Sequence, residues 1–440
     1  MTRDEGPRWV VMKFGGKSVS TAHHWKTIAA QIRERQQEGL RPFVVCGAIR
    51  RVTRLLNETI QRAASGEAEP LLQQVAAIHD ELGDALGLDQ SHAIVAEEID
   101  ELERLVGRIE FSHEVSPAIR ARILAAGELM LTRVGGAFLE QEGLEPVSLD
   151  AREVLRSVDS FDTTQRRRYL VAECDSAPDP ALQKTLRRLD AGVVLTQGFI
   201  AGNRDGETVL LGWGGSDKSA ACFAAKLEAE RMELWSDVPG IFTTDPHRVP
   251  SARLLRVLDY AEAQELASTG AEVIYPGAIE PLRNAGVPLH IRSINQPDVD
   301  RTVIGAQQSP GQQVKAISVR RGITLISIDT VLMWHQVGFL ARLFEVLARH
   351  DLSVDLVATA ETNVTVTIDP IGEVEPETIE AALEELGGFC DARQIPSCAV
   401  ISLVGRDLRS ILPDLAPALE VMEEQRVHLV SQSASDLDFS

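Results

Sequence analysis

The sequence lacks the features that would place the chain in a membrane or on a secretory route. None of its apolar runs approaches the roughly 20 residues that a membrane-spanning helix needs. The first residues, MTRDEGPRWVVMKF, contain no apolar signal core ahead of a small-residue cleavage site. We therefore expect a cytoplasmic protein with no membrane partner.

Basic charge and paired cysteines are also scarce. Lysine and arginine number 44 against 65 acidic residues, which gives a formal net charge of −21. Nucleic acids and anionic membranes bind clustered cations, so this composition argues against both partners but not against a nucleotide, whose phosphates are bound locally. The five cysteines form no CxxC pair and have no metal-ligand spacing, which predicts reduced, mostly buried thiols and no protein-bound metal site.

The first two thirds of the chain alternate between apolar, strand-like runs and helical patterns. With 440 residues and 44% apolar side chains, the chain is long enough for two or three domains, each with its own core. The expected strands are Trp9–Phe14, Pro42–Ala48, Ala191–Gln197, Met232–Ser236 and, as the last one, Gly286–Ile291, with helices at Ala22–Gln37 and along Pro70–Arg108. This alternation predicts an α/β fold with a largely parallel sheet.

The residue composition changes near residues 295–313, where polar and turn-forming residues predict a linker. Beyond it, two β-α-β-β-like patterns follow each other. The first has a strand at 323–328, a helix at 338–350 and a strand at 363–368; the second has a strand at 398–405, a helix at 415–425 and a strand at 427–431. We expect domains at 1–300, 314–395 and 396–440. The last domain lacks its closing helix, so it is either incomplete or cut from a longer chain.

Two glycine-rich turns contain the candidate anion-binding residues. The turn Lys13-Phe14-Gly15-Gly16-Lys17-Ser18 follows a strand and precedes a helix, where free N–H groups attract anions. A P-loop would need glycine at position 11, which is Val11. Taken alone, the motif also fits a tight turn with solvated lysines.

The second turn, Gly212-Trp213-Gly214-Gly215-Ser216-Asp217, has the same strand-to-helix setting. A third segment, Trp235–Pro246, is dense in turn formers and hydroxyl groups. Phosphoryl transfer needs cations on the transferring oxygens and groups that orient both reactants. A lysine turn and an aspartate turn in one domain are consistent with that chemistry, although the third segment also fits simple turns.

These three motifs, in this order and spacing, resemble the signatures of the aspartate kinase family. Supporting matches are Gly127-Glu128-Leu129-Met130 and Gln197-Gly198-Phe199-Ile200, and the resemblance covers essentially the whole chain. It implies an amino-acid kinase fold, a mostly parallel sheet sandwiched by helices, followed by tandem ferredoxin-like ACT units. It also implies ATP and Mg²⁺ as cofactors, a carboxylate acceptor that becomes an acyl phosphate, and a homodimer paired through the ACT domains.

The resemblance further implies roles for individual residues. Lys13 would stabilise the transferring phosphoryl group, Asp217 would organise the phosphates and the lysine, and Glu128 would bind the substrate amino group. Further substrate contacts would be Thr53, Phe199, Trp213 and Ser216, and nucleotide contacts would be Gly15, Gly16, Lys17, Gly215, Ser236, Asp237, Phe242 and Arg248.

Several positions depart from the family pattern, and they cluster in the ligand-contacting motifs. Trp213 stands where an arginine clasps the substrate α-carboxylate, which an indole cannot do. Glu272 stands where a lysine contacts the nucleotide. Cations are new at Lys17, Arg51, Arg54 and Lys218; they would either compensate for the lost charge or fill the nucleotide pocket.

Three functions therefore stay open at this point. The first is an aspartate kinase whose new cations take over carboxylate binding. The second is a phosphotransferase for another carboxylate, with an acceptor pocket reshaped by Trp213. The third is an inactive homologue that keeps a binding or regulatory role.

The C-terminal part resembles the effector-binding ACT segment of lysine-sensitive members. A helix opening at Gly338 would offer N–H groups to a ligand carboxylate, and Asp355 would pair with its ammonium group. The expected effector contacts are Met333, Gly338, Phe339, Leu340, Val354 and Asp355, with lysine as the effector. Alternatively, the helix only packs on a sheet and Asp355 is a solvated charge.

Overall fold

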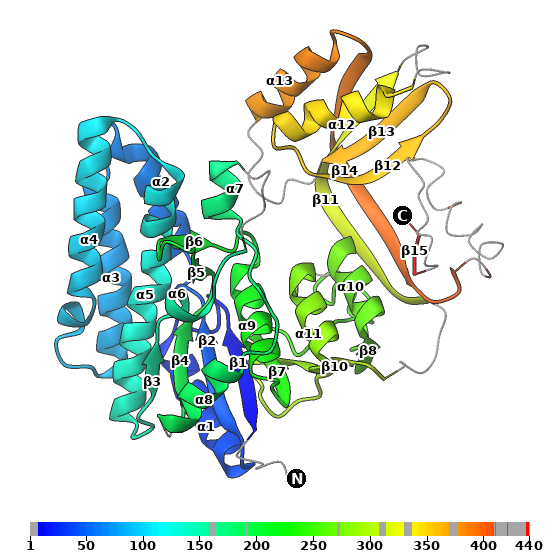
Figure 1. Cartoon of the computed structure of the whole chain (residues 1–440). Helices are drawn as coiled ribbons and strands as arrows, with labels where there is room; N and C mark the ends of the chain where they lie inside the picture. The colour runs from blue at the N-terminus through cyan, green and yellow to red at the C-terminus, as the bar shows by residue number, and fades with distance from the viewer. Residues whose placement is uncertain are drawn as a thin grey trace. The chain divides into compact units, whose positions relative to one another are not determined.

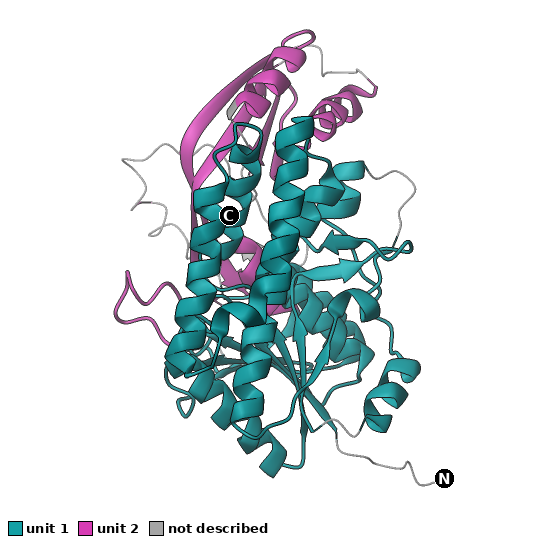
Figure 2. Ribbon diagram, turned by 90° about the vertical axis from the view of Figure 1, so that its left-hand side faces the viewer, with its two compact units in different colours: residues 1–241, 254–260, 272–309 teal, residues 242–253, 261–271, 310–440 magenta. Residues whose placement is uncertain are grey.

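The computed structural model describes residues 8–158, 164–189, 192–270, 273–307, 314–329, 337–368, 376–408, 410, 420 and 437–439. The chain divides into two compact units (Figure 2). Unit 1 comprises residues 1–241, 254–260 and 272–309; unit 2 comprises residues 242–253, 261–271 and 310–440.

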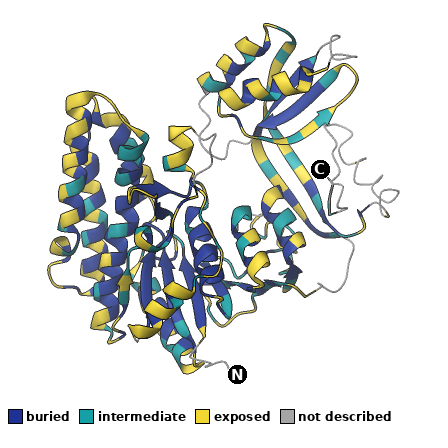
Figure 3. Ribbon diagram, in the orientation of Figure 1, coloured by how far each residue is buried: buried dark blue, intermediate teal, exposed yellow. Residues whose placement is uncertain are grey.

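Unit 1 is built on an eight-stranded sheet in the order β3-β4-β2-β1-β7-β9-β10-β8 (Figure 1). In that order the strands are Val147–Leu149, Val194–Gln197, Arg41–Cys46, Trp9–Phe14, Arg231–Ser236, Leu289–Ser293, Thr302–Gly305 and Val257–Asp259. All neighbours are parallel except β9 and β10. The central strands β1, β2, β4 and β7 are almost wholly buried, as continuous apolar runs in a covered parallel sheet should be (Figure 3).

The helices of unit 1 are α1 Ala22–Gln37, α2 Val52–Ala63, α3 Glu69–Leu86, α4 Ser91–Ser112, α5 Pro117–Gln141, α6 Ala151–Val154, α7 Gln165–Leu170, α8 Pro180–Arg188, α9 Gly215–Lys226 and α11 Ile279–Ala285, with a 3₁₀ turn at Pro276–Ala278. Helices α1, α5 and α9 pack on the sheet, whereas α2, α3 and α4 pack on α5 and on one another. A small hairpin joins β5 Ile200–Gly202 to β6 Thr208–Leu210. Helix α1 is anchored to β7 because Arg35 Nε donates to Glu233 Oε1 at 2.9 Å, with both side chains fully buried.

Two sequence-based expectations for unit 1 are wrong in detail. The helical stretch expected along Pro70–Arg108 is two helices, because Gly87 caps α3 with a left-handed φ of +74° and the chain reverses before α4. The segment Gly286–Ile291 is not the last strand. Gly286 caps α11, β9 begins at Leu289, and β10 follows inside the segment expected to be a linker.

Unit 2 contains a five-stranded antiparallel sheet in the order β12-β13-β11-β14-β15. The strands are Val354–Thr359, Asn363–Ile368, Val314–Asp329, Asp391–Gly405 and Asp438–Phe439. Helices α12 Phe339–Arg349 and α13 Pro376–Leu386 pack on this sheet through a shared core that includes Ile326, Leu343 and Val366. Helix α10, Tyr260–Thr269, falls largely in the same unit. The expected fold class is confirmed: a mostly parallel α/β sheet followed by an antiparallel ACT-like one.

Strand β14 crosses the expected boundary between the two ACT-like repeats. Strand β14 is continuous through residues 395 and 396, where the sequence suggested a boundary between two ACT units. Apart from Glu420, the helix expected at 415–425 and the strand expected at 427–431 lie outside the described residues. No helix in the described ranges is long and apolar enough to cross a membrane.

Candidate active site

The carboxyl ends of four adjacent parallel strands meet at one edge of the unit 1 sheet. Phe14 at the end of β1 is in register with Cys46 of β2 and with Trp235 of β7, and Gln197 at the end of β4 is in register with Cys46. Loops that leave this edge form the ligand crevice in open α/β sheets. Both glycine-rich turns and the Gln197–Phe199 turn lie here.

Lys13 and Asp217 form the centre of this edge. Lys13 Nζ lies 2.5 Å from Asp217 Oδ1, and their side chains are only 10% and 12% exposed. Asp217 is in the first turn of α9, and its second carboxylate oxygen accepts a hydrogen bond from the backbone N–H of Tyr275 at 3.2 Å. The pair therefore fixes the lysine ammonium beside the amino end of a helix, where phosphate oxygens are favoured.

Glycines bring three turns into contact around this pair. A Cβ on Gly16 would lie 2.8 Å from the carbonyl oxygen of Ala48, and one on Gly198 would lie 2.7 Å from Ser216 Cβ. A Cβ on Gly215 would lie 2.6 Å from the Phe199 ring. These contacts leave no room for side chains, so the glycines permit the close approach that creates the crevice.

Glu128 of α5 is buried beside the same turns. Its Oε1 accepts a hydrogen bond from the backbone N–H of Ala48 at 3.0 Å, while its Oε2 has no partner among the described residues. Burial raises the pKa of Glu128 to about 8, against the smaller opposing effect of the Ala48 N–H. A ligand ammonium group would supply both the missing donor and the missing charge.

Lys17 and Asp237 close the other side of the crevice. Lys17 Nζ donates to Asp237 Oδ2 at 2.7 Å, and Ser236 Oγ donates to Asp237 Oδ1 at 3.1 Å. Partial burial works to raise the pKa of Asp237, but the hydrogen bond and charge of Lys17 outweigh it and leave the pKa below its usual value. The new cation at position 17 therefore pairs with a carboxylate, and its side chain is 60% exposed.

Most of the sequence-based site residues thus come together in unit 1. Thr53 is exposed in the first turn of α2, and Trp213 is 67% exposed. Phe242 and Arg248 fall in unit 2, where Arg248 pairs with Asp245 at 3.2 Å. Glu272 lies outside the described residues.

Lys218 does not compensate for lost charge in the crevice, so that expectation is wrong. Its side chain is 10% exposed and its Nζ lies 2.9 Å from Glu173 Oε1, in a separate cavity shared with Cys174 and Cys222. The reason is its position on α9: one residue after Asp217 is a rotation of about 100° around the helix, which turns the side chain away from Lys13.

The five cysteines are all free, but they are less buried than the sequence indicated. Cys46 and Cys222 are buried, whereas Cys174, Cys390 and Cys398 are partly buried. Burial raises the pKa of Cys46 to about 12, with a smaller opposing effect of Lys13. The Cys46 thiol beside Lys13 is therefore protonated near neutral pH.

The expected effector residues lie in unit 2, apart from Met333, which lies outside the described residues. Gly338 caps α12 with a φ of +90°, the side chain of Phe339 is buried against Phe389, and Leu340 is 39% exposed. Asp355 is exposed and pairs with Arg320 Nη1 at 2.7 Å, so it is a surface charge with an ion-pair partner.

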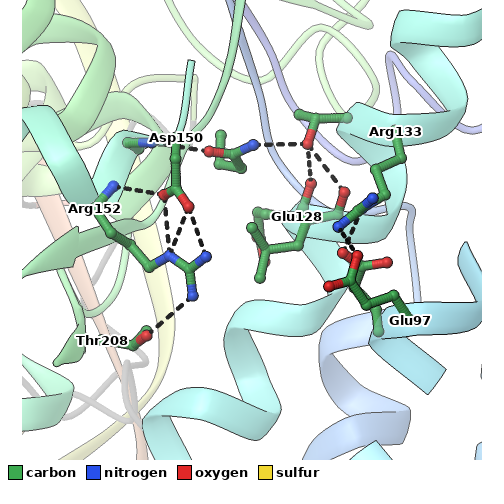
Figure 4. Close-up of polar contacts among 11 residues, drawn as sticks. Glu97, Glu128, Arg133, Asp150, Arg152 and Thr208 are labelled. Atoms are coloured by element: carbon green, nitrogen blue, oxygen red, sulfur yellow. Dashed lines mark hydrogen bonds and ion pairs between the residues drawn. The ribbon is translucent and has the colours of Figure 1, made fainter. Parts of the chain in front are cut away.

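Sequence reasoning missed the network that supports Glu128. Thr132, one turn along α5, donates to the Glu128 carbonyl at 2.9 Å and accepts from Gln197 Nε2 at 2.8 Å. Gln197 Oε1 in turn accepts from the Ala151 N–H at 2.9 Å (Figure 4). The available signal was that Gln197 ends a buried strand as a polar residue and so needed partners.

The Amino acid kinase family matches residues 8–293, and an ACT domain matches residues 326–371. Lysine-sensitive aspartokinase 3 of Escherichia coli is 32% identical over 97% of this chain and 93% of its own length. Aspartokinase 1, chloroplastic, of Arabidopsis thaliana is 30% identical over 99% of this chain and 78% of its own length.

Solved structures agree. That of E. coli aspartokinase III with aspartate and ADP matches with a TM-score of 0.85 and 30% identity, over 98% of this chain and 95% of that one. The same enzyme with lysine and aspartate matches with a TM-score of 0.76. The chain belongs to the amino acid kinase family. Within that family it is an aspartokinase homologue along essentially its whole length.

Proposed function

We propose that the chain phosphorylates the side-chain carboxylate of L-aspartate with ATP and forms 4-phospho-L-aspartate. The observation that carries this proposal is the buried Lys13–Asp217 pair at the amino end of α9. Support comes from the relatives, which are named aspartokinases, and from the neighbouring structure with bound aspartate and ADP.

In this proposal the residues act by position and charge. The Lys13 ammonium stabilises the oxygens of the transferring phosphoryl group, and Asp217 orients it. The Gly15, Gly16 and Gly215 backbones admit the phosphates. Glu128 receives the substrate ammonium group, since its Oε2 has no partner among the described residues.

Mg²⁺ fits the site as a companion of ATP rather than as a resident ion. Among the described residues no group of three or more His, Cys, Asp or Glu side chains is arranged to hold a metal ion. Mg²⁺ commonly binds through substrate phosphates with few protein ligands. When bound, it would neutralise charge on the phosphate oxygens.

A phosphotransferase with an acceptor carboxylate other than aspartate is the alternative, because the exposed Trp213 supplies no guanidinium fork for an α-carboxylate.

We further propose a cytoplasmic homodimer that is paired through the ACT domains. We also propose that lysine regulates it, since the E. coli relative is named as lysine-sensitive. Light scattering with and without lysine measures the mass of the particle in solution and so tests the homodimer.

Acyl-phosphate trapping with hydroxylamine tests the activity. With ATP, Mg²⁺ and aspartate the parent chain should form the hydroxamate, and Lys13→Ala should lower the rate by about 100-fold or more. Lys26→Ala, an exposed lysine of α1, is the matched control and should retain the parent rate. Near-normal turnover by Lys13→Ala would remove Lys13 from its role; product with another carboxylate but not with aspartate would favour the alternative.

A further inference from the structure

A second charged cavity lies in unit 1, on a different side of α5 from the Ala48 contact of Glu128. Its volume is about 440 Å³, and its walls come from α4, α5 and Arg152 of α6 (Figure 4). The apolar part is formed by Leu102, Ala126 and Leu129. Residues of α5 that line it recur every three or four positions, so they share one face of the helix.

The cavity is lined by equal numbers of opposite charges, four carboxylates and four guanidinium groups. Many of these groups already pair: Arg133 with Glu97 at 2.7 Å and with Glu98, and Arg122 with Glu101. A simple anion would meet the carboxylates and a simple cation the guanidinium groups. A ligand that carries both charges fits this lining best.

Glu98 is the incompletely satisfied member of the cavity. Its side chain is 9% exposed; Oε1 pairs with Arg133, and Oε2 has no hydrogen-bond partner among the described residues. Burial raises the pKa of this carboxyl group, against the opposing charge of Arg133. A buried carboxylate oxygen without a donor is unfavourable, so a donor from a ligand would stabilise it.

Arg152 supplies a fixed cation on the other side. Its Nε and Nη2 bind Asp150 at 2.9 and 2.6 Å, and its Nη1 donates to Thr208 at 3.3 Å (Figure 4). The hydrogen bond to Asp150 is the main reason that its pKa is raised, and the charge of Glu98 contributes as well. The pair with Asp150 orients the guanidinium group before any ligand arrives and occupies its Nε–Nη2 edge, so a ligand carboxylate would bind through the remaining N–H of Nη1.

We propose that this cavity binds a small zwitterion, an α-amino acid with an apolar side chain. Its ammonium group pairs with Glu98, its carboxylate lies against Arg152, and its side chain covers the patch formed by Leu102, Ala126 and Leu129. The proposed occupant is not a metal ion, because no group of three or more His, Cys, Asp or Glu among the described residues is arranged to hold one. The site is independent of the proposed phosphoryl transfer.

Calorimetry on the full chain tests this site with L-leucine and two blocked forms. N-acetyl-L-leucine lacks the ammonium group, and L-leucinamide lacks the carboxylate. L-leucine should bind in the millimolar range or tighter, and each blocked form about tenfold more weakly, since each loses one charge-assisted hydrogen bond. Equal binding of N-acetyl-L-leucine would identify an anion site and overturn the proposal, as would the absence of leucine binding.

Variants assign the binding to this cavity. Glu98→Gln and Arg152→Gln should each weaken leucine binding by about tenfold or more. Glu103→Gln, an exposed residue of the same helix α4, should retain it. Asp355→Ala in unit 2 should also retain it; loss of binding in that variant alone would assign leucine to unit 2 and overturn the proposal. Because each cavity variant is sufficient by itself, the failure of one to fold leaves the other decisive.

Discussion

Single residues decide how this chain departs from the family pattern. Trp213 replaces a guanidinium fork with an exposed indole, and its neighbours Gly212 and Gly214 both have left-handed φ values. Lys17 is held by Asp237, whereas Lys218 is turned into another cavity and paired with Glu173. The altered positions therefore have separate consequences and do not act as one replacement set of cations.

Restoring the fork at position 213 tests the acceptor pocket. Trp213→Arg should lower the KM for aspartate by about tenfold or more, because a bidentate arginine–carboxylate pair is a charge-assisted interaction. The side chain is 67% exposed, so the change should leave the core and the melting temperature intact. Trp213→Gln, which removes the ring without adding the fork, is the control. An unchanged KM in Trp213→Arg would point to a different acceptor.

The protonation of Glu128 should appear in the pH dependence of stability. The pKa of Glu128 is raised from 4.5 to about 8 in the folded chain. Its stabilising contribution to the free energy of unfolding is therefore fully present below pH 4.5 and is lost as the pH rises through 8. The parent should therefore lose stability relative to Glu128→Gln over that window, by an amount on the order of a few kcal/mol.

Melting temperatures of both proteins between pH 5 and 8.5 measure this difference. If the gap between parent and Glu128→Gln does not change with pH, the carboxyl group is not shifted. Aspartate binding by the parent should also release protons near pH 7, because an ammonium partner favours the ionised carboxylate. Calorimetry in buffers of different ionisation enthalpy detects that release.

At the scale of elements, helix α5 contributes both to the active-site edge of the sheet and to the cavity beside α4. It carries Glu128 toward the active-site turns and Arg133 toward the cavity beside α4. It approaches α1 closely at Gly135, where a Cβ would lie 2.1 Å from the Trp25 ring. Trp25 is buried and its Nε1 donates to the Val19 carbonyl at 3.0 Å, so the ring has little freedom to move.

Two adjacent glycines of α5 should therefore respond in opposite ways to alanine. Gly135→Ala should destabilise unit 1 by about 1–3 kcal/mol through overpacking against Trp25. Gly136→Ala has its nearest neighbour at 3.7 Å and should stabilise it by about 0.5–1 kcal/mol, since alanine favours the helix. Denaturant midpoints of the two variants measure the difference. Shifts of equal sign would contradict the packing of α1 on α5.

The whole molecule joins an α/β unit to an antiparallel ACT-like unit. In unit 2, Gly338 opens α12 and Asp355 lies in β12, paired with Arg320. A helix start and a carboxylate together suit a zwitterion such as lysine. The Asp355–Arg320 pair implies that a ligand ammonium group would compete with Arg320 for the carboxylate.

Lysine should therefore raise the melting temperature and weaken aspartate binding by about 5–150-fold, the usual range of coupling between sites. Asp355→Ala should abolish both effects, whereas Glu361→Ala, an exposed acidic residue in the following turn, should retain them. Calorimetry with lysine, threonine and methionine gives the comparison. A parent chain with no heat and no thermal shift in lysine would exclude lysine as the effector.

The sequence by itself determined the elements and the family. Apolar runs placed β1 and β7, the glycine-rich turns marked Lys13 and Asp217, and the motif order indicated an aspartate kinase. These features are local, because strand formation and tight turns depend on residues that are near in the chain.

Only the tertiary structure decided which side chains meet. Strands β1 and β7 are adjacent in the sheet although most of unit 1 separates them in sequence, and that pairing helps bring the two glycine-rich turns to one edge. The raised pKa of Glu128, the turn of Lys218 toward Glu173 and the cavity between α4 and α5 follow from burial and helix packing. Burial and charge pairing depend on neighbours distant in the chain, which a local pattern does not contain.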